Sequence, residues 1–74
     1  MEKGTVIKVK HPKSGDLLQY VVVKEVSDGT MRLVNMNTWN VMNGFKTRDP
    51  ENIRLYITGI LGCEILSEEK FLNS

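Results

Sequence analysis

The chain has few side chains that could carry out chemistry. His11 is its only histidine and Cys63 its only cysteine. A zinc site needs about four nitrogen, sulfur or oxygen ligands, and no CxxC or HxxxH spacing is present. A nucleophilic cysteine needs a base and an orienting third group, and no such third group is evident. We therefore interpret His11, beside Pro12, as a turn residue and Cys63 as a small core hydrophobe.

No other pattern indicates catalysis or a cofactor. The segment Gly59-Ile60-Leu61-Gly62 is too short and too apolar to be a phosphate-binding loop. Asp16, Asp28 and Asp49 all stand in expected turns, so nothing favours a paired-carboxylate site. We expect a protein that is not an enzyme, holds no metal or cofactor, and acts by binding.

Trp39 is the strongest candidate for a binding residue. It is the only tryptophan and stands between Asn37 and Asn40 in a segment that predicts a turn. Turns lie at the surface, and aromatic anchors dominate interface energetics. Phe45, in a predicted loop, would extend the same patch. The alternative is that Trp39 folds back over the core as a lid.

Basic side chains are the second candidate. They are Lys8, Lys10, His11 and Lys13, joined by Lys46 and Arg48. With Trp39 or Tyr20 as a stacking platform, they would suit single-stranded nucleic acid. The alternative is a solvated edge on which lysines prevent strand-to-strand aggregation. The net charge of +1 argues against strong nonspecific binding to nucleic acid.

The C-terminal part carries much apolar surface for so small a chain. Its apolar residues include Ile57, Ile60, Leu61, Ile65, Leu66, Phe71 and Leu72. Part of this surface would suit a homo-oligomer interface, which would add stability that a thin core lacks. Such an oligomer would be able to hold a small anionic nucleotide between subunits, with Lys and Arg on its phosphates.

Length limits the architecture to one domain, residues 1–74. A single cysteine fits a reducing compartment, and no stretch approaches the ~20 apolar residues that cross a bilayer. The N-terminal segment has no apolar core of a signal peptide, so we expect a cytoplasmic protein. Charge is uneven, with +4 over 1–48 and −3 over 49–74. This asymmetry marks a binding face, or the two halves neutralise each other in the fold.

The first half predicts strands over 4–10, 17–26 and 31–36, from alternation and β-branched residues. Tyr20-Val21-Val22-Val23 is apolar on both faces, as in sheets that curl over themselves. Asp28-Gly29, between two apolar runs, predicts a type I′ hairpin.

The second half predicts a short strand around 40–43 and a polar loop over 44–52. Asp49-Pro50-Glu51 has the pattern of a helix start. Residues 53–60 fit helical and strand spacing, and their β-branched content favours a strand after one helical turn. A further strand is expected over 62–66. Ser67-Glu68-Glu69 then predicts a short C-terminal helix.

These elements predict a mainly β fold. Five or six short strands with tight turns suit an SH3-like or similar small barrel. The alternative is a strongly curled antiparallel sheet with a short C-terminal helix.

Two segments carry a resemblance to a known class of proteins. Leu33-Val34-Asn35-Met36-Asn37-Thr38, after an Asp-Gly hairpin and a YVVVKEV strand, resembles a segment of many small phage and prophage proteins. The tail Glu64-Ile65-Leu66-Ser67-Glu68-Glu69-Lys70-Phe71 adds to the likeness. The resemblance covers residues 17–43 and 64–71 and implies an SH3-like accessory protein, with no catalytic residue carried over. This chain departs from the pattern at one point, since it has Trp39 where the turn would carry Gly.

We therefore predict a non-enzymatic binding module, a phage-type accessory protein that binds a host protein through loop-borne aromatics; binding that inhibits the host protein is one form of this prediction. The predicted binding residues are Trp39, Asn37, Asn40, Phe45, Lys8, Lys10, Lys46 and Arg48. The alternatives are a nucleic-acid-binding barrel, an oligomer that sequesters an anionic nucleotide, and a structural part of a virion.

Overall fold

The computed structural model describes residues 3–42 and 44–70. Five strands form one antiparallel sheet in the order β4-β3-β2-β1-β5. They are β1 (Thr5–Lys10), β2 (Leu17–Lys24), β3 (Met31–Asn35), β4 (Asn40–Val41) and β5 (Glu64–Lys70). Between β4 and β5 lies a helix with an α-helical part, α1 (Pro50–Leu55), and a π-helical part, η1 (Tyr56–Ile60). Among residues 3–42 and 44–70, no helix is long and apolar enough to cross a membrane.

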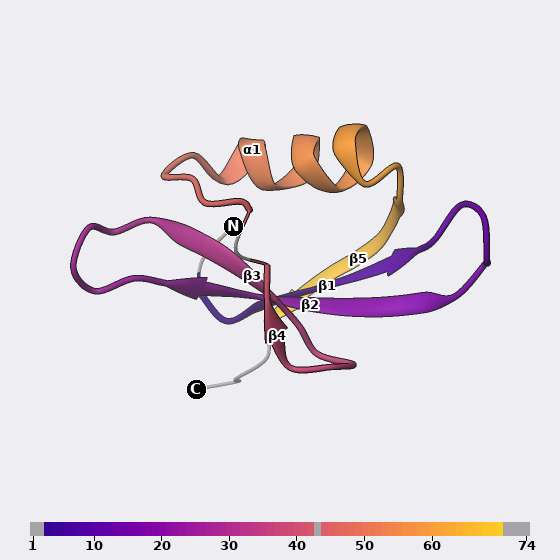
Figure 1. Ribbon diagram of the computed structural model, residues 1–74, viewed down its shortest axis with the longest axis horizontal. Helices are drawn as coiled ribbons and strands as arrows, with labels where there is room; N and C mark the ends of the chain where they lie inside the picture. The colour runs from indigo at the N-terminus through magenta and orange to yellow at the C-terminus, as the bar shows by residue number, and fades with distance from the viewer. Residues whose placement is uncertain (1–2, 43, 71–74) are drawn as a thin grey trace.

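The sheet is twisted and open, and the helix packs across one of its faces (Figure 1). β4 and β5 are its two edges and do not pair with each other, so the sheet does not close into a barrel. The predicted fold class, mainly β with a short helix near the C-terminus, is confirmed. The two predicted architectures were a small barrel and a strongly curled antiparallel sheet, and the chain adopts the sheet. The turn between β3 and β4 projects on the side opposite the helix (Figure 1).

Alternation sorts the strand side chains between the two faces. The predicted strands at 4–10, 17–26 and 31–36 are confirmed to within two residues. The hydrophobic core lies between the sheet and the helix and contains Ile7, Val9, Tyr20, Val22, Met31, Leu33, Ile53, Ile57 and Cys63. Burial of each large aliphatic side chain contributes about 1.5–3 kcal/mol, so this single layer is the main source of stability.

Residues 50–60 are helical, so the expectation of a strand over 53–60 is wrong, whereas the predicted helix start is confirmed. Asp49 is the N-cap, and its carboxylate accepts a bond of 3.0 Å from the Glu51 N–H. Pro50 follows at the start of the helix. Ile53 and Ile57, one turn apart, are both fully buried against the sheet. Burial of this pair outweighs the weak preference of isoleucine for strands.

The π-helical turn decides which residue faces the sheet. The Leu61 N–H donates to the Tyr56 carbonyl at 3.0 Å, a bond that encloses one residue more than an α-helical turn. In a continued α-helix, Ile60 would share the buried face of Ile53 and Ile57. Instead Ile60 is 75% exposed, and Leu61 packs against the core in its place.

The helix predicted over 67–70 is wrong, because these residues belong to β5. They pair with β1, with Thr5 opposite Lys70 and Ile7 opposite Glu68. The Arg54 guanidinium donates to both carboxylate oxygens of Glu68 at 2.8 Å, which ties the helix to β5. These non-local contacts override a local pattern typical of a helix start.

The turn between β2 and β3 is not type I′, which requires positive φ at both central residues. Gly29 has φ of 73°, but Asp28 is not among the positive-φ residues of the described chain. The turn is longer, with the Gly29 N–H donating to the Glu25 carbonyl and the Glu25 N–H to the Thr30 carbonyl. The Asp28 carboxylate accepts bonds from the Thr30 hydroxyl and N–H at 2.7 and 2.9 Å, and these bonds lower the pKa of Asp28.

Candidate functional site

A row of valines crosses the face of the sheet that the helix leaves uncovered. Val6 of β1 lies opposite Val21 of β2. On the far side of β2, Val34 of β3 lies opposite Val21, and Val41 of β4 lies opposite Val34. Successive side chains of a strand alternate between faces, so these four point away from the helix. We refer to Val6, Val21, Val34 and Val41 as the valine row.

The charges that flank the valine row are paired within the chain. Lys8 lies on the same face two residues after Val6, and its ammonium is 3.3 Å from the Glu69 carboxylate. Arg32 lies two residues before Val34, and its Nε is 3.4 Å from the Glu25 carboxylate. The uncovered face therefore combines an apolar centre with a largely neutralised border.

Trp39 stands at the β4 end of this face in an unusual backbone conformation. Its φ is 59°, and it is the one non-glycine residue with positive φ in residues 3–42 and 44–70. The Trp39 N–H donates to the Asn35 carbonyl at 2.6 Å, which closes the turn. The side-chain oxygen of Asn35 accepts further bonds from the N–H groups of Asn37 and Thr38. The Trp39 side chain is 65% exposed, so it is not a lid over the core.

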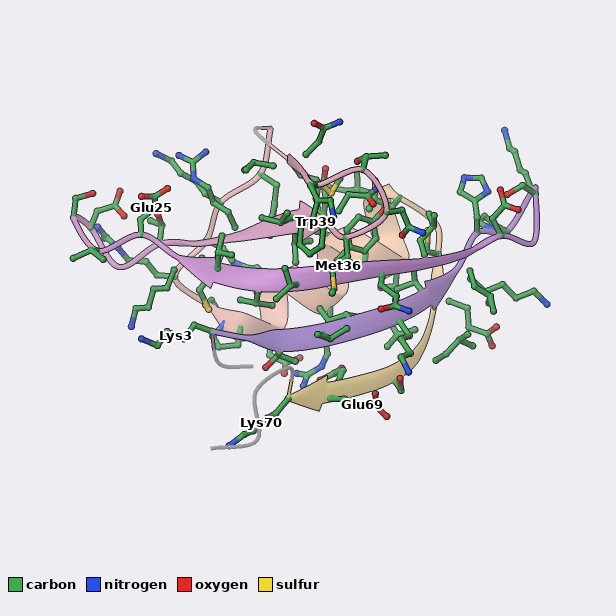
Figure 2. The ribbon with its side chains drawn as sticks, turned by 90° about the horizontal axis from the view of Figure 1, so that it is seen from below. Lys3, Glu25, Met36, Trp39, Glu69 and Lys70 are labelled. Carbon is green, nitrogen blue, oxygen red and sulfur yellow. The ribbon has the colours of Figure 1, made fainter. Side chains whose placement is uncertain are left out.

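Two bonds fasten the Trp39 turn to β2. The Met36 N–H donates to the Gln19 carbonyl at 2.8 Å, and the Gln19 N–H donates to the Asn37 side-chain oxygen at 3.2 Å. Asn37 thus holds the turn in place, and Asn40 begins β4 opposite Asn35. Figure 2 looks onto the uncovered face and shows Trp39 and Met36 close together over the middle of the sheet.

Phe45 does not extend this surface, contrary to expectation. Its ring stacks on Tyr56 of the helix, with ring centroids 4.1 Å apart and planes 20° apart. Both rings are partly buried against the core. Phe45 therefore fastens the loop before the helix, on the side of the sheet away from Trp39.

The predicted basic cluster is divided between opposite ends of the sheet. Lys10 ends β1 beside the first hairpin turn and is exposed. The Arg48 guanidinium donates to the Asp28 carbonyl at 3.2 Å, and the positive charges of Lys46 and Arg48 help to lower the pKa of Asp28. Asp28 lies in the other hairpin turn, beyond the eight residues of β2, which at ~3.3 Å per residue span about 25 Å (Figure 1). The lysines at 8 and 10 and the cations at 46 and 48 do not form one surface.

The candidate reactive side chains have structural partners. The His11 Nδ1 accepts bonds from the N–H groups of Lys13 and Ser14 at 3.2 and 3.4 Å, which stabilise the first hairpin turn. Cys63 is buried in the core, as expected, with its thiol 3.8 Å from the Leu61 carbonyl. In the part of the chain that the structure describes, no three His, Cys, Asp or Glu residues gather as metal ligands.

The apolar C-terminal part mainly builds the core. Ile57 is fully buried, and Leu61 and Ile65 pack against the core cluster. Ile60 and Leu66 are the exposed members of the described set, at 75% and 50%. Phe71 and Leu72 lie outside the described residues.

Sequence reasoning did not find the valine row. The signal was present in Tyr20-Val21-Val22-Val23, which is apolar on both faces. That signal indicates burial or contact on both sides of β2 but does not say which residues stand beside it. Only the strand register aligns Val6, Val21 and Val34. No protein-family model, curated protein or solved structure matches this chain.

Proposed function

We propose that this chain is a non-catalytic binding module that docks a protein partner on the uncovered face of its sheet. The contact surface consists of Val21, Val34 and Val41 of the valine row with Trp39 and Met36, since Val6 is buried at 6% exposure. This proposal keeps the predicted role of Trp39 and replaces Phe45 and the basic residues with the valine row. The resemblance to small phage accessory proteins fits a role that consists of binding a host protein and thereby inhibiting it.

The observation that carries the proposal is the cost of Trp39 to the fold. A left-handed backbone conformation costs a residue with a Cβ roughly 1–2 kcal/mol, which glycine avoids at such positions. The buried part of the Trp39 side chain can offset this cost, but 65% of the side chain stays exposed and makes no contact within its own chain that would account for a tryptophan there. Strained residues of this kind cluster at ligand clamps and binding sites, where a partner supplies the missing contacts.

The composition of the face favours a protein over a nucleic acid. Interface cores are enriched in Trp, Met and Arg and depleted in Lys and Glu. Trp39 and Met36 lie on this face, whereas its cations Lys8 and Arg32 are already engaged by Glu69 and Glu25. A nucleic-acid site needs a continuous positive track for the phosphates, and the predicted basic cluster is divided, with Lys46 and Arg48 separated from Lys10 by the length of β2.

The test is affinity capture from host lysate with the chain and its Trp39→Asn variant. Asparagine tolerates the left-handed conformation, so this change removes the indole and keeps the turn. We expect Trp39→Asn to lose the captured partner while its melting temperature stays close to that of the unmodified chain. Leu55→Gln is the matched control, because Leu55 is 64% exposed but lies on the helix at the opposite face.

The outcome that contradicts the proposal is equal capture by Trp39→Asn and the unmodified chain. Loss of the partner in Leu55→Gln alone would move the binding surface to the helix. Nuclease treatment of the lysate distinguishes a protein partner from one bridged by nucleic acid, since a bridged partner disappears on treatment.

A further inference from the structure

The last turn of the helix contains two aliphatic neighbours that compete for one core position. Ile60 is 75% exposed, whereas Leu61 is partly buried and packs against the core cluster. Successive residues of an α-helix lie about 100° apart around its axis, so the position next to Ile57 takes only one of the two. We propose that residues 56–61 form a two-register element. Its π register, seen in the structure, has Leu61 inward, and its α register has Ile60 inward.

The carbonyl groups at this end of the helix have a donor in either register. In the π register the Tyr56 carbonyl accepts from the Leu61 N–H, and the Ile57 carbonyl accepts from the Cys63 N–H, both at 3.0 Å. In an α-helix each carbonyl accepts from the N–H four residues later. The same two carbonyls would then accept from the N–H groups of Ile60 and Leu61. The change of register therefore leaves neither carbonyl without a bond.

Gly62 provides the α register with a regular helix end. Its φ of 69° is left-handed, and it directly follows the C-cap residue Leu61. In the Schellman motif, the residue after such a glycine donates to the carbonyl five residues before it. The Cys63 N–H would thus move by one carbonyl, from Ile57 to Thr58. The backbone groups are satisfied in both registers, so side-chain packing decides between them.

The register determines how much apolar surface the helix exposes. Leu55 and Ile60 are 64% and 75% exposed, so the π register leaves two large aliphatic side chains in water. In the α register Ile60 withdraws into the core. Gly59 does not fix either arrangement, because it has no side chain and a Cβ added there would meet nothing within 4 Å. Two packings of one sequence that differ little in free energy are the basis of conformational switches.

This element is separate from the proposed binding surface. It lies on the helix, which covers the face of the sheet opposite the valine row (Figure 1). The inference therefore stands or falls independently of a partner at Trp39.

The first experiment asks whether Ile60 enters the core when Leu61 is shortened. The readout is the exposure of the Ile60 δ1 methyl group, measured by NMR as the relaxation that a dissolved gadolinium chelate induces. In Leu61→Ala we expect this relaxation to fall several-fold relative to the unmodified chain, because Ile60 becomes buried. Leu55→Ala is the matched control, since Leu55 is exposed on the same helix and its loss should leave the Ile60 methyl as exposed as before.

Two results of this experiment would overturn the inference. One is an Ile60 methyl that stays equally exposed in folded Leu61→Ala. The other is a Leu61→Ala variant that does not fold, because Ile60 would then be unable to fill the vacated position.

The second experiment measures the coupling between the two side chains by thermal unfolding. Leu61→Ala removes the side chain that occupies the core position, and Ile60→Ser removes its replacement. We expect the double variant to lose more melting temperature than the sum of the two single losses, because neither side chain is left to fill the position. Leu55→Ser combined with Leu61→Ala is the control pair and should be additive. Additive losses for Ile60→Ser with Leu61→Ala would refute the two-register element.

Discussion

The π-helical turn makes a sharp prediction about two isoleucines. Ile57 and Ile60 stand three residues apart, and helical spacing alone assigns both to the buried face with Ile53. In the structure Ile57 is fully buried and Ile60 is 75% exposed. We predict that Ile57→Ala strongly destabilises the fold, whereas Ile60→Ala leaves its stability nearly unchanged.

The magnitudes follow from burial. Truncation of a fully buried isoleucine to alanine costs about 2–5 kcal/mol, because it removes transfer free energy and leaves a cavity. Ile60 retains a quarter of its burial, which at ~1.5–3 kcal/mol for a full side chain amounts to about 0.4–0.8 kcal/mol. The higher helix propensity of alanine offsets about 0.3–0.4 kcal/mol of this loss. The two variants should therefore differ by about 2–4 kcal/mol.

Thermal and urea unfolding followed by circular dichroism measure this difference. For a domain of this size, 1 kcal/mol shifts the melting temperature by roughly 4–8 °C, so the two variants should melt at least ~8 °C apart. Leu61→Ala should fall between them, because Leu61 packs at the margin of the core. Equal destabilisation by Ile57→Ala and Ile60→Ala would show that the helix continues without the π turn, and the reasoning would be wrong.

Three further predictions concern the helix and the Trp39 turn. The bonds from Arg54 hold the pKa of Glu68 below its ordinary value of 4.5, so the pair stabilises the fold above that pH and is lost as the pH falls through the lowered pKa. When the pH is lowered, the free energy of unfolding of the Glu68→Gln variant should fall without the contribution of this pair. A variant whose free energy of unfolding falls with pH just as that of the unmodified chain does would contradict the prediction. Asp49→Ala should cost about 1 kcal/mol in urea unfolding, since it removes the N-cap bond to Glu51, whereas a loss below the error of measurement would show that the cap contributes nothing. Trp39→Asn should change the free energy of unfolding by about 1 kcal/mol or less, because relief of the left-handed strain offsets the modest burial that is lost. A loss several times larger would mean that Trp39 is a core residue.

Much of the site depended on contacts that local patterns do not encode. Trp39 was found from its type and its turn, and the structure places it on an exposed left-handed position. Phe45 was assigned to the same patch because it is close in sequence, but the loop carries it to Tyr56 on the other face. Lys46 and Arg48 were grouped with Lys8 because of their charge, but the fold places them beside Asp28, at the other end of the sheet from Lys10. Neither proximity along the chain nor shared charge tells which face or end of a sheet a residue reaches.

The sequence by itself determined the features that arise from short-range physics. Alternating β-branched residues specified β1, β2 and β3, Asp49 with Pro50 specified where the helix begins, and the sparse set of reactive residues argued for binding. Only the tertiary structure decided that 53–60 continue as helix, that Ser67–Lys70 pair with β1, and that four valines align across four strands. Strand register and strand partners are set by which faces are buried together, and a one-residue shift would have turned every valine of one strand to the other side. The candidate binding surface is therefore a property of the assembled sheet and of no single segment of the chain.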